Sequence, residues 1–316
     1  MTTEKVYLKP YTIEEALEFA KKHKNSFRFI AGGTDVIVNK FQGNDNADCF
    51  IDLAEIDEMK SITIEDNLLK IGALVRLDDL KNNKIISEKF PSLIQAANAV
   101  ASPMLRKTAT IGGNVLCENR CKFYNQTEWW REAAGHCLKC NGNICIATGG
   151  KNKCFAKFVS DTAPVLISMN ALLEIADNAG IKIVPLKDIY TGDGIKPRNL
   201  LTESLLKNII LPLDKEYKVV FNKLRPRETV DFTSLTTAVS VSKNQEVKIV
   251  IGGIDSRPLI FEAKTSSNFA DIIENAVKSS KPVDNDYYSR AYRKEMVAVF
   301  LRKSLEELNL IVHLAE

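Results

Sequence analysis

The alternation of hydrophobic and polar positions predicts a small α/β lobe over residues 1–58. Thr12-Ile13-Glu14-Glu15 has the spacing of a capping box, and the apolar residues that follow recur at helical spacing, which predicts a helix over residues 12–22. Apolar runs at 27–31 and 49–53 predict two buried strands, with a short helical or irregular piece at 35–40 between them. The first strand leads directly into a glycine pair.

The period changes after residue 59, where a second lobe is expected over residues 59–214. Alternating apolar residues around Asp66-Asn67 predict a β-hairpin. The further elements expected are helices at 77–82, 91–101 and 165–169 and strands at 172–176 and 181–184. All periodicity is lost between residues 117 and 157, and an irregular stretch of that length inside a compact domain is usually functional.

The last third of the chain follows a linker at 191–204 and places strands before helices. Strand-like runs occur at 208–213, 218–224, 234–241 and 247–251, and helical spacing follows at 269–278 and 286–307. With a domain boundary at residue 214, residues 215–316 are expected to form an α+β domain in which a three-stranded sheet packs under helices.

Composition and charge exclude several classes of protein. Apolar residues make up 45% of the 316 residues and charged residues 26%, which is typical of a folded globular protein. The surplus of 43 basic over 40 acidic residues is +3, too small to indicate binding to nucleic acid or to anionic lipid. No run reaches 18 apolar residues, so no membrane span is expected. The start of the chain does not resemble a secretory signal, and the predicted location is the reducing cytoplasm.

Two loops share the pattern of an apolar run followed by a glycine pair and small polar residues. They are Ala31-Gly32-Gly33-Thr34-Asp35 and Thr110-Ile111-Gly112-Gly113-Asn114. Without a Cβ atom, glycines let backbone amides turn towards an anion, and a pyrophosphate is a suitable guest. Neither loop has the dinucleotide-binding or P-loop spacing, so both of those site types are excluded. A glycine pair can also serve only as a tight turn.

The cysteines are the main chemical clue. Six of the seven fall between residues 117 and 154, and the seventh, Cys49, stands alone in an apolar run where a buried, inert thiol is expected. Thiolates favour zinc or iron–sulfur clusters, and four suffice for either. Cys117/Cys121 with Cys137/Cys140 would give the paired spacing of a zinc site. Cys121, Cys137, Cys145 and Cys154 would give the wider spread of a cluster-binding loop. The three histidines, His23, His136 and His313, offer little material for a histidine-rich metal site.

Together, the two glycine loops, the cysteine segment and Ser160-Asp161 with Pro164 resemble the FAD-binding medium subunit of the xanthine dehydrogenase/molybdenum hydroxylase family. The resemblance implies an α+β fold with a two-lobed FAD-binding domain of the PCMH/VAO type plus a C-terminal α+β domain. The residues that it implies for FAD are Ile30, Ala31, Gly32, Gly33, Thr34, Asp35, Ala101, Thr110, Ile111, Gly112, Gly113, Asn114, Asp161 and Lys223.

The cysteine segment is similar to that of one subfamily, the β subunits of 4-hydroxybenzoyl-CoA reductases. This resemblance implies a 4Fe–4S cluster on Cys121, Cys137, Cys145 and Cys154, within an insertion at about 117–157. It implies an electron-transfer role, from ferredoxin through the cluster and FAD to 2Fe–2S clusters on a small subunit and a molybdenum cofactor on a large one. The implied reaction is reductive dehydroxylation of 4-hydroxybenzoyl-CoA to benzoyl-CoA, in a dimer of heterotrimers. No residue of this chain is expected to be catalytic.

Three other functions remain open. One is an FAD subunit of a xanthine- or aldehyde-type hydroxylase that carries an extra cluster and passes electrons outward to NAD or ferredoxin. Another is a self-sufficient flavin oxidase or dehydrogenase, which would need a substrate base near the flavin. The last is a non-catalytic interaction subunit whose cysteine segment binds zinc. Trp129 and Trp130 are expected to shield the metal, and His136 is expected to be a solvated loop residue.

Overall fold

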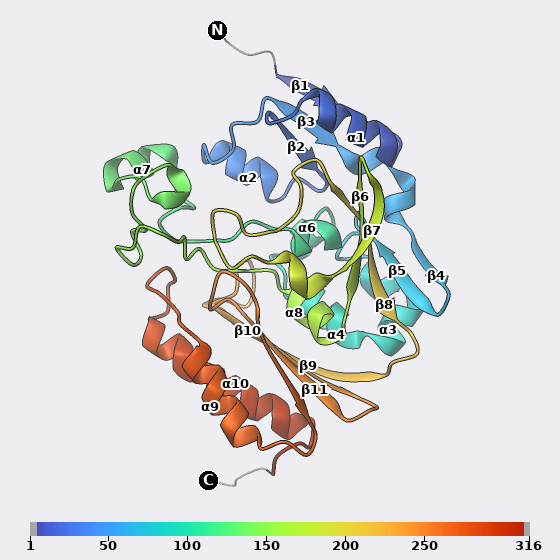
Figure 1. Ribbon diagram of the computed structural model, residues 1–316, viewed down its shortest axis with the longest axis vertical. Coiled ribbons are helices and arrows are strands. Elements are labelled where there is room, and N and C mark those ends of the chain that lie inside the picture. Colours follow the sequence, from blue (N-terminus) through green and yellow to red (C-terminus); the bar gives the residue numbers. More distant parts are fainter. Residues whose placement is uncertain (1–4, 313–316) are drawn as a thin grey trace.

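The computed structural model describes residues 5–312 and arranges them in three sheets with helices around them (Figure 1). His313 lies outside the described residues. In the N-terminal lobe, β1 (Val6–Leu8), β3 (Cys49–Asp52) and β2 (Phe27–Ile30) form a parallel sheet in that order. This lobe also holds α1 (Ile13–Lys22) and α2 (Val36–Phe41). The side chain of Thr12 accepts a hydrogen bond from the amide of Glu15, which confirms Thr12 as the N-cap, whereas the Glu15 carboxylate accepts from the amide of Tyr11 at 2.8 Å instead of from that of Thr12.

The second sheet is antiparallel and has five strands in the order β4-β5-β8-β6-β7. Its strands are β4 (Ile62–Glu65), β5 (Leu68–Gly72), β6 (Leu172–Asp177), β7 (Gly180–Pro185) and β8 (Leu205–Pro212). The helices of this region are α3 (Lys84–Lys89), α4 (Pro91–Asn98), α5 (Pro103–Arg106), α6 (Ile111–Val115), α7 (Glu128–Ala134) and α8 (Thr162–Ser168). One continuous apolar core joins the first two sheets, so the two lobes are packed as one body.

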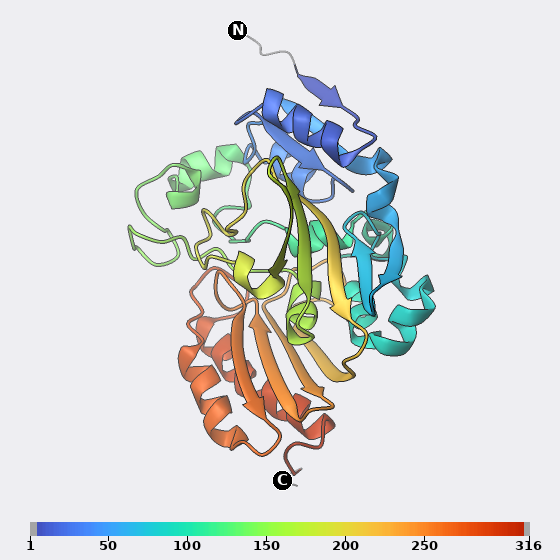
Figure 2. The ribbon, with the colours of Figure 1, turned by 45° about the vertical axis from the view of Figure 1, so that its right-hand side comes forward.

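The C-terminal sheet has the order β12-β11-β10-β9 and is antiparallel throughout. Its strands are β9 (Tyr217–Leu224), β10 (Leu235–Ser242), β11 (Glu246–Gly252) and β12 (Leu259–Lys264). Helices α9 (Phe269–Ser279) and α10 (Arg290–Glu307) cover one face and enclose a second apolar core, and α8 packs against β10 and β11 on the other face (Figure 2).

The mixed helix-and-sheet class is as predicted, but several elements differ. The C-terminal sheet has four strands instead of three, because the edge strand β12 is only partly buried and carries charged residues, so it lacks a clear apolar alternation. The helix expected at 77–82 is a single 3₁₀ turn, Leu80–Asn82, since the amides of Leu77 and Asp78 donate instead to the carbonyls of Ala109 and Arg106.

The last helix was predicted from residue 286 but begins at Arg290. Ser289 caps it by accepting a hydrogen bond from the amide of Tyr292, 3.2 Å away. Asp286 lies outside the helix because its carboxylate is buried against the Nζ of Lys157 and the hydroxyl of Ser234. Within residues 5–312, no helix is both long and apolar enough to cross a membrane.

Candidate functional site

The first glycine loop connects β2 to α2 and presents unpaired backbone amides. Within the described chain, none of the amides of residues 32–36 has a hydrogen-bond acceptor. Gly33 has a φ of +69°, a left-handed conformation that turns successive amides towards one side. A Cβ atom on Gly32 would overlap the carbonyl of Thr108, so this residue must be glycine for the first loop to lie against the segment before the second. The loop therefore offers a set of backbone amide donors without acceptors, which suits an anion.

The second glycine loop differs from the first in the hydrogen bonding of its amides. Thr110 caps α6 by accepting a hydrogen bond from the amide of Gly113 at 3.1 Å, and the amide of Gly112 donates to the carbonyl of Ala73 at 2.9 Å. Both amides therefore have acceptors within the protein, unlike those of residues 32–36. A Cβ atom on Gly112 would lie 2.6 Å from that of Ala73, whereas one on Gly113 would meet only the hydroxyl of Thr110, at 3.0 Å.

Asn114, at the end of the second loop, holds the Ser-Asp motif in place. Its Oδ1 accepts hydrogen bonds from the hydroxyls of Ser160 and Thr162, at 2.9 and 2.7 Å, and from the amide of Thr162 at 3.2 Å. The motif begins α8, whose residues are all buried. Two predicted site segments that are far apart in the sequence are thus brought side by side.

Asp161 and Lys223 form a buried ion pair beside these loops. The Lys223 Nζ lies 2.7 Å from Asp161 Oδ2 and also donates to the carbonyl of Ala99 at 2.9 Å. Burial raises the pKa of Asp161, and Lys223 and Arg225 oppose that rise. The second oxygen of Asp161, Oδ1, is buried and has no hydrogen-bond partner. The whole residue is only 3% exposed. An unpaired carboxylate oxygen of this kind fits a hydrogen-bond donor on a bound ligand.

Ala101 lies two residues beyond the carbonyl that Lys223 contacts. It has a φ of +43°, and its own carbonyl accepts a hydrogen bond from the amide of Val230 at 2.9 Å. A continuous series of contacts therefore joins the predicted site: the first loop touches Thr108, Asn114 holds the Ser-Asp motif, and Lys223 connects Asp161 to the turn around Ala101.

The cysteine segment folds around a small cavity. All four of the thiols implied as cluster ligands line one pocket of about 10 Å³, together with mostly apolar side chains and Lys139; the four are Cys121, Cys137, Cys145 and Cys154. Cys121, Cys137 and Cys145 each begin a tight turn closed by hydrogen bonds to their carbonyl oxygens. Backbone hydrogen bonds of 2.9 and 2.8 Å between Arg120 and Lys157 close the two ends of the segment.

The spread of the four thiols indicates what the cavity can hold. Within residues 5–312, no group of three or more cysteine, histidine or acidic side chains converges closely enough to bind a single metal ion. The four sulfurs surround a cavity instead of meeting at one point. Burial raises the pKa of Cys154 to about 11, whereas a hydrogen bond from the Cys140 thiol lowers that of Cys137 to about 6. Cys117 and Cys140 do not line the cavity, so the paired zinc pattern is not assembled.

The tryptophans do not shield this cavity, contrary to expectation. Trp129 lies on α7 and is 75% exposed, and neither it nor Trp130 lines the cavity. The shielding comes from Phe123, Tyr124 and Ile146. His136 is exposed and Cys49 is buried, as predicted.

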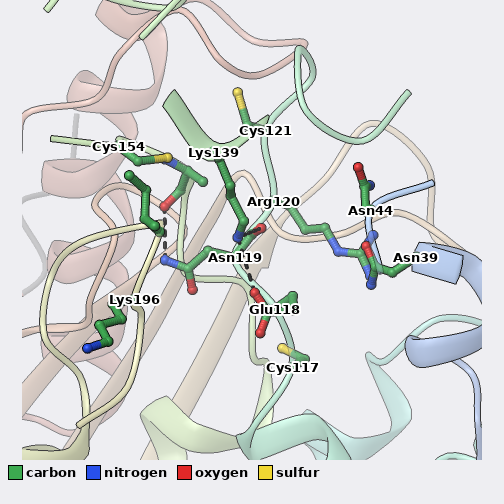
Figure 3. Close-up of polar contacts among 12 residues, drawn as sticks. Asn39, Asn44, Cys117, Glu118, Asn119, Arg120, Cys121, Lys139, Cys154 and Lys196 are labelled. Carbon is green, nitrogen blue, oxygen red and sulfur yellow. Dashed lines mark hydrogen bonds and ion pairs between the residues drawn. The ribbon is translucent and has the colours of Figure 1, made fainter. Parts of the chain in front are cut away.

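Sequence reasoning missed a set of charged side chains between the two predicted sites. Glu118 pairs with Lys139 and Arg198 at 3.1 and 2.6 Å, and Arg120 pairs with Asp35 of the first glycine loop. Burial would raise the pKa of Glu118, but the two cations outweigh it and hold that pKa at about 2. Figure 3 shows Lys139 reaching down to Glu118, while Arg120 extends towards Asn39 of α2. The available signal was the presence of charged residues between cysteines, at 118, 120 and 139.

Comparison with known proteins matches residues 2–214 to the family described as the FAD binding domain in molybdopterin dehydrogenase. The chain is 25% identical over 298 residues to the FAD-binding subunit of the Escherichia coli aldehyde oxidoreductase, PaoB, covering 88% of this chain and 91% of that one. It is 22% identical to the glyceraldehyde dehydrogenase medium chain of Sulfolobus acidocaldarius, covering 96% and 97%. It is 24% identical to the nicotinate dehydrogenase FAD-subunit of Eubacterium barkeri, covering 74% and 68%.

Solved structures show the same fold. A chain of quinoline 2-oxidoreductase from Pseudomonas putida 86 superposes with a TM-score of 0.75 at 16% identity, covering 96% of each chain. A chain of CO dehydrogenase from Oligotropha carboxidovorans gives 0.74 at 19% identity, covering 97% of this chain and 98% of that one. The protein belongs to the family of FAD-binding domains of molybdopterin dehydrogenases, and it is an oxidoreductase subunit.

The site described above fits FAD, the cofactor of this family. The free amides of residues 32–36 suit a diphosphate, and the unpaired Oδ1 of Asp161 suits a hydroxyl donor. The isoalloxazine of a bound FAD exchanges electrons singly or in pairs. The residues of this chain contribute by holding the cofactor and its surroundings in place.

Proposed function

We propose that this chain carries both FAD and a 4Fe–4S cluster and conducts electrons within a multisubunit molybdenum enzyme. The observation that carries the proposal is the convergence of Cys121, Cys137, Cys145 and Cys154 on one cavity. A tetrahedral zinc ion would need its four sulfurs about 2.3 Å from one centre. A 4Fe–4S cluster takes four cysteine thiolates, and four thiols that line one pocket without meeting at a single point suit it better. The apolar lining favours the exclusion of water.

We also propose 4-hydroxybenzoyl-CoA reduction as the reaction of the whole complex. The support for this is the cysteine insertion, whose ligand spacing is similar to that of the reductase β subunits. In this proposal, the chain accepts electrons from a ferredoxin and delivers them towards a small 2Fe–2S subunit and a large molybdenum subunit, in a dimer of heterotrimers. The chain itself supplies no group that contacts the thioester substrate.

The alternative is a hydroxylase of the xanthine or aldehyde type that sends electrons outward to NAD or ferredoxin. It is favoured by the names of the relatives, which include an aldehyde oxidoreductase and a nicotinate dehydrogenase. The two functions differ in the direction of electron flow. The anaerobic complex should form benzoyl-CoA from 4-hydroxybenzoyl-CoA with a reduced low-potential donor. Oxidation of aldehydes or N-heteroaromatic compounds with no benzoyl-CoA formed would favour the alternative.

Cluster binding can be tested by anaerobic purification followed by counts of flavin, iron, acid-labile sulfide and zinc. We expect one FAD and four iron atoms per chain. Cys121→Ser and Cys154→Ser should lose the iron, whereas the matched control Cys117→Ser should retain it, because Cys117 does not line the cavity. Full iron in both ligand variants, or zinc without sulfide in the unmodified protein, would refute the cluster assignment.

A further inference from the structure

The segment 117–121 lies between the first glycine loop and the cysteine cavity and contacts both. Asp35 closes the row of free amides, yet its carboxylate makes no capping hydrogen bond to its own helix. It turns to the cysteine segment instead, accepting a hydrogen bond from the amide of Glu118 at 3.2 Å and pairing with the guanidinium of Arg120. The position of the anion-binding loop therefore depends on the position of residues 118–120.

The same segment is tied to the cavity by two routes. Arg120 is adjacent to Cys121, which lines the cavity, and its backbone pairs with Lys157 where the cysteine segment closes. The carboxylate of Glu118 pairs with Lys139. Lys139 lines the cavity and lies in the sequence between Cys137 and Cys140. Both contacts are made by buried basic side chains, since those of Arg120 and Lys139 are only 8% and 6% exposed.

Arg120 is buried, but one of its hydrogen-bond donors has no acceptor. Its guanidinium lies 4.4 Å from the centre of the Phe232 ring, a cation–π distance, and its Nε is buried without an acceptor. In Figure 3 the side chain reaches from the cysteine segment towards Asn39 of α2. The buried guanidinium next to Asp35 therefore moves whenever residue 120 shifts. Because the interior is closely packed, its neighbours must move with it.

We infer that the Asp35–Arg120 and Glu118–Lys139 ion pairs couple the two cofactor sites, so that each cofactor is bound more tightly when the other is present. This rests on the proposed function, because it requires a cluster in the cysteine cavity. A cluster bound to four cysteines spread over residues 121–154 would cross-link the 117–157 segment and stabilise its order. Loss of that order releases Arg120 and the amide of Glu118, and with them the first glycine loop. Coupling between two sites is reciprocal, so FAD must protect the cluster by the same factor.

The test uses the full chain, purified anaerobically with both cofactors. Its cluster is removed with a chelator and a mild oxidant, and the Kd of FAD is measured by flavin fluorescence with and without the cluster. We expect the ratio of the two Kd values to be roughly tenfold, within the usual range for coupled sites. The rate of iron loss to a chelator should rise correspondingly when FAD is removed.

Arg120→Met should bring this ratio close to one, and Arg120→Lys should restore part of it. The control is Arg28→Met, which removes another Arg–Asp pair of the same lobe, with Asp45 at 2.6 Å, without touching the cysteine segment. It should leave the ratio unchanged. If Arg120→Met does not fold, as judged by circular dichroism and gel filtration, Glu118→Gln decides the question by breaking the link to Lys139, and it should lower the ratio.

A ratio near one in the unmodified protein with both cofactors bound would overturn this inference and leave the proposed function standing. An unchanged ratio in Arg120→Met or, if that variant does not fold, in Glu118→Gln would do the same. Unmodified protein that binds FAD but no iron would overturn the proposed cluster, and this inference with it.

Discussion

The Nζ of Lys223, on β9 of the C-terminal sheet, lies 2.7 Å from the Oδ2 of Asp161 at the start of α8. Both side chains are about 5% exposed or less. The pair therefore joins the C-terminal sheet to the FAD-binding region through a contact that water cannot replace. The resemblance implied Lys223 as a residue of the FAD site, but the sequence did not predict its pairing with Asp161.

Lys223→Met should leave the carboxylate of Asp161 buried and unpaired. Removal of one partner from a buried pair costs about 3–5 kcal/mol of unfolding free energy. Because burial raises the pKa of Asp161, the loss should be greatest at neutral pH and smaller in acid, where protonation removes the buried charge. Urea unfolding at two pH values measures this. A variant equally destabilised at both values would contradict the assignment of the cost to the unpaired carboxylate.

The two glycines of the second loop should behave differently when changed to alanine. Gly112→Ala forces a Cβ atom against Ala73 at 2.6 Å and should cost about 1–3 kcal/mol of stability, as overpacking does. Gly113→Ala meets only the hydroxyl of Thr110 within the protein, so stability should change little. If Gly113 faces FAD, its alanine variant should lose flavin at unchanged melting temperature. Normal flavin content in Gly113→Ala would remove this residue from the cofactor site.

Gly194 lies against a proposed cluster ligand. A Cβ atom there would be 2.7 Å from the Sγ of Cys154 and 2.8 Å from the Cβ of Ala156. Gly194→Ala should therefore displace the thiol and weaken iron retention roughly tenfold, the effect typical of disturbing the support of a ligand. Gly150→Ala is the control, because its nearest neighbour would be the hydroxyl of Thr148 at 3.3 Å. Iron loss to a chelator, followed over time, compares the two, and equal rates would contradict the prediction.

The free energy of unfolding in acid should depend on the ionisation of Glu118. Its pKa falls from an ordinary 4.5 to about 2 in the folded protein, because Arg198 and Lys139 outweigh the effect of burial. A lowered pKa in the folded state contributes stability above pH 4.5, and this contribution is lost as the pH falls towards 2. The difference in unfolding free energy between the unmodified protein and Glu118→Gln should thus be constant near neutrality and shrink between pH 4.5 and 2. A difference that grows in acid would contradict it.

The sequence predicted local features well where a single pattern determined them. The helix after Thr12 and the hairpin at Asp66-Asn67 depend on nearby residues, and both form. The missed features depend on distant partners. Asp286 stays outside its predicted helix because of Lys157, and the amide of Gly112 donates to the carbonyl of Ala73. Trp129 is exposed, although its apolar character indicated burial.

The candidate site was predictable in its residue types but not in its connections. The four cysteines that line the cavity are the set implied by the resemblance, and their spacing alone left zinc open. The ion pairs of Asp35, Glu118 and Lys139 could not be predicted, because they join segments from three separate parts of the chain. Only the folded arrangement brings them together.

The position of β8 in the second sheet has a consequence for synthesis of the protein. β8 pairs with both β5 and β6, and the cysteine segment lies in the sequence between those two strands. The sheet cannot close until residues 205–212 have left the ribosome, and such distant pairings form slowly. The thiols therefore emerge before the scaffold that positions them is complete, and we expect the proposed cluster to be inserted only after residues 205–212 have emerged.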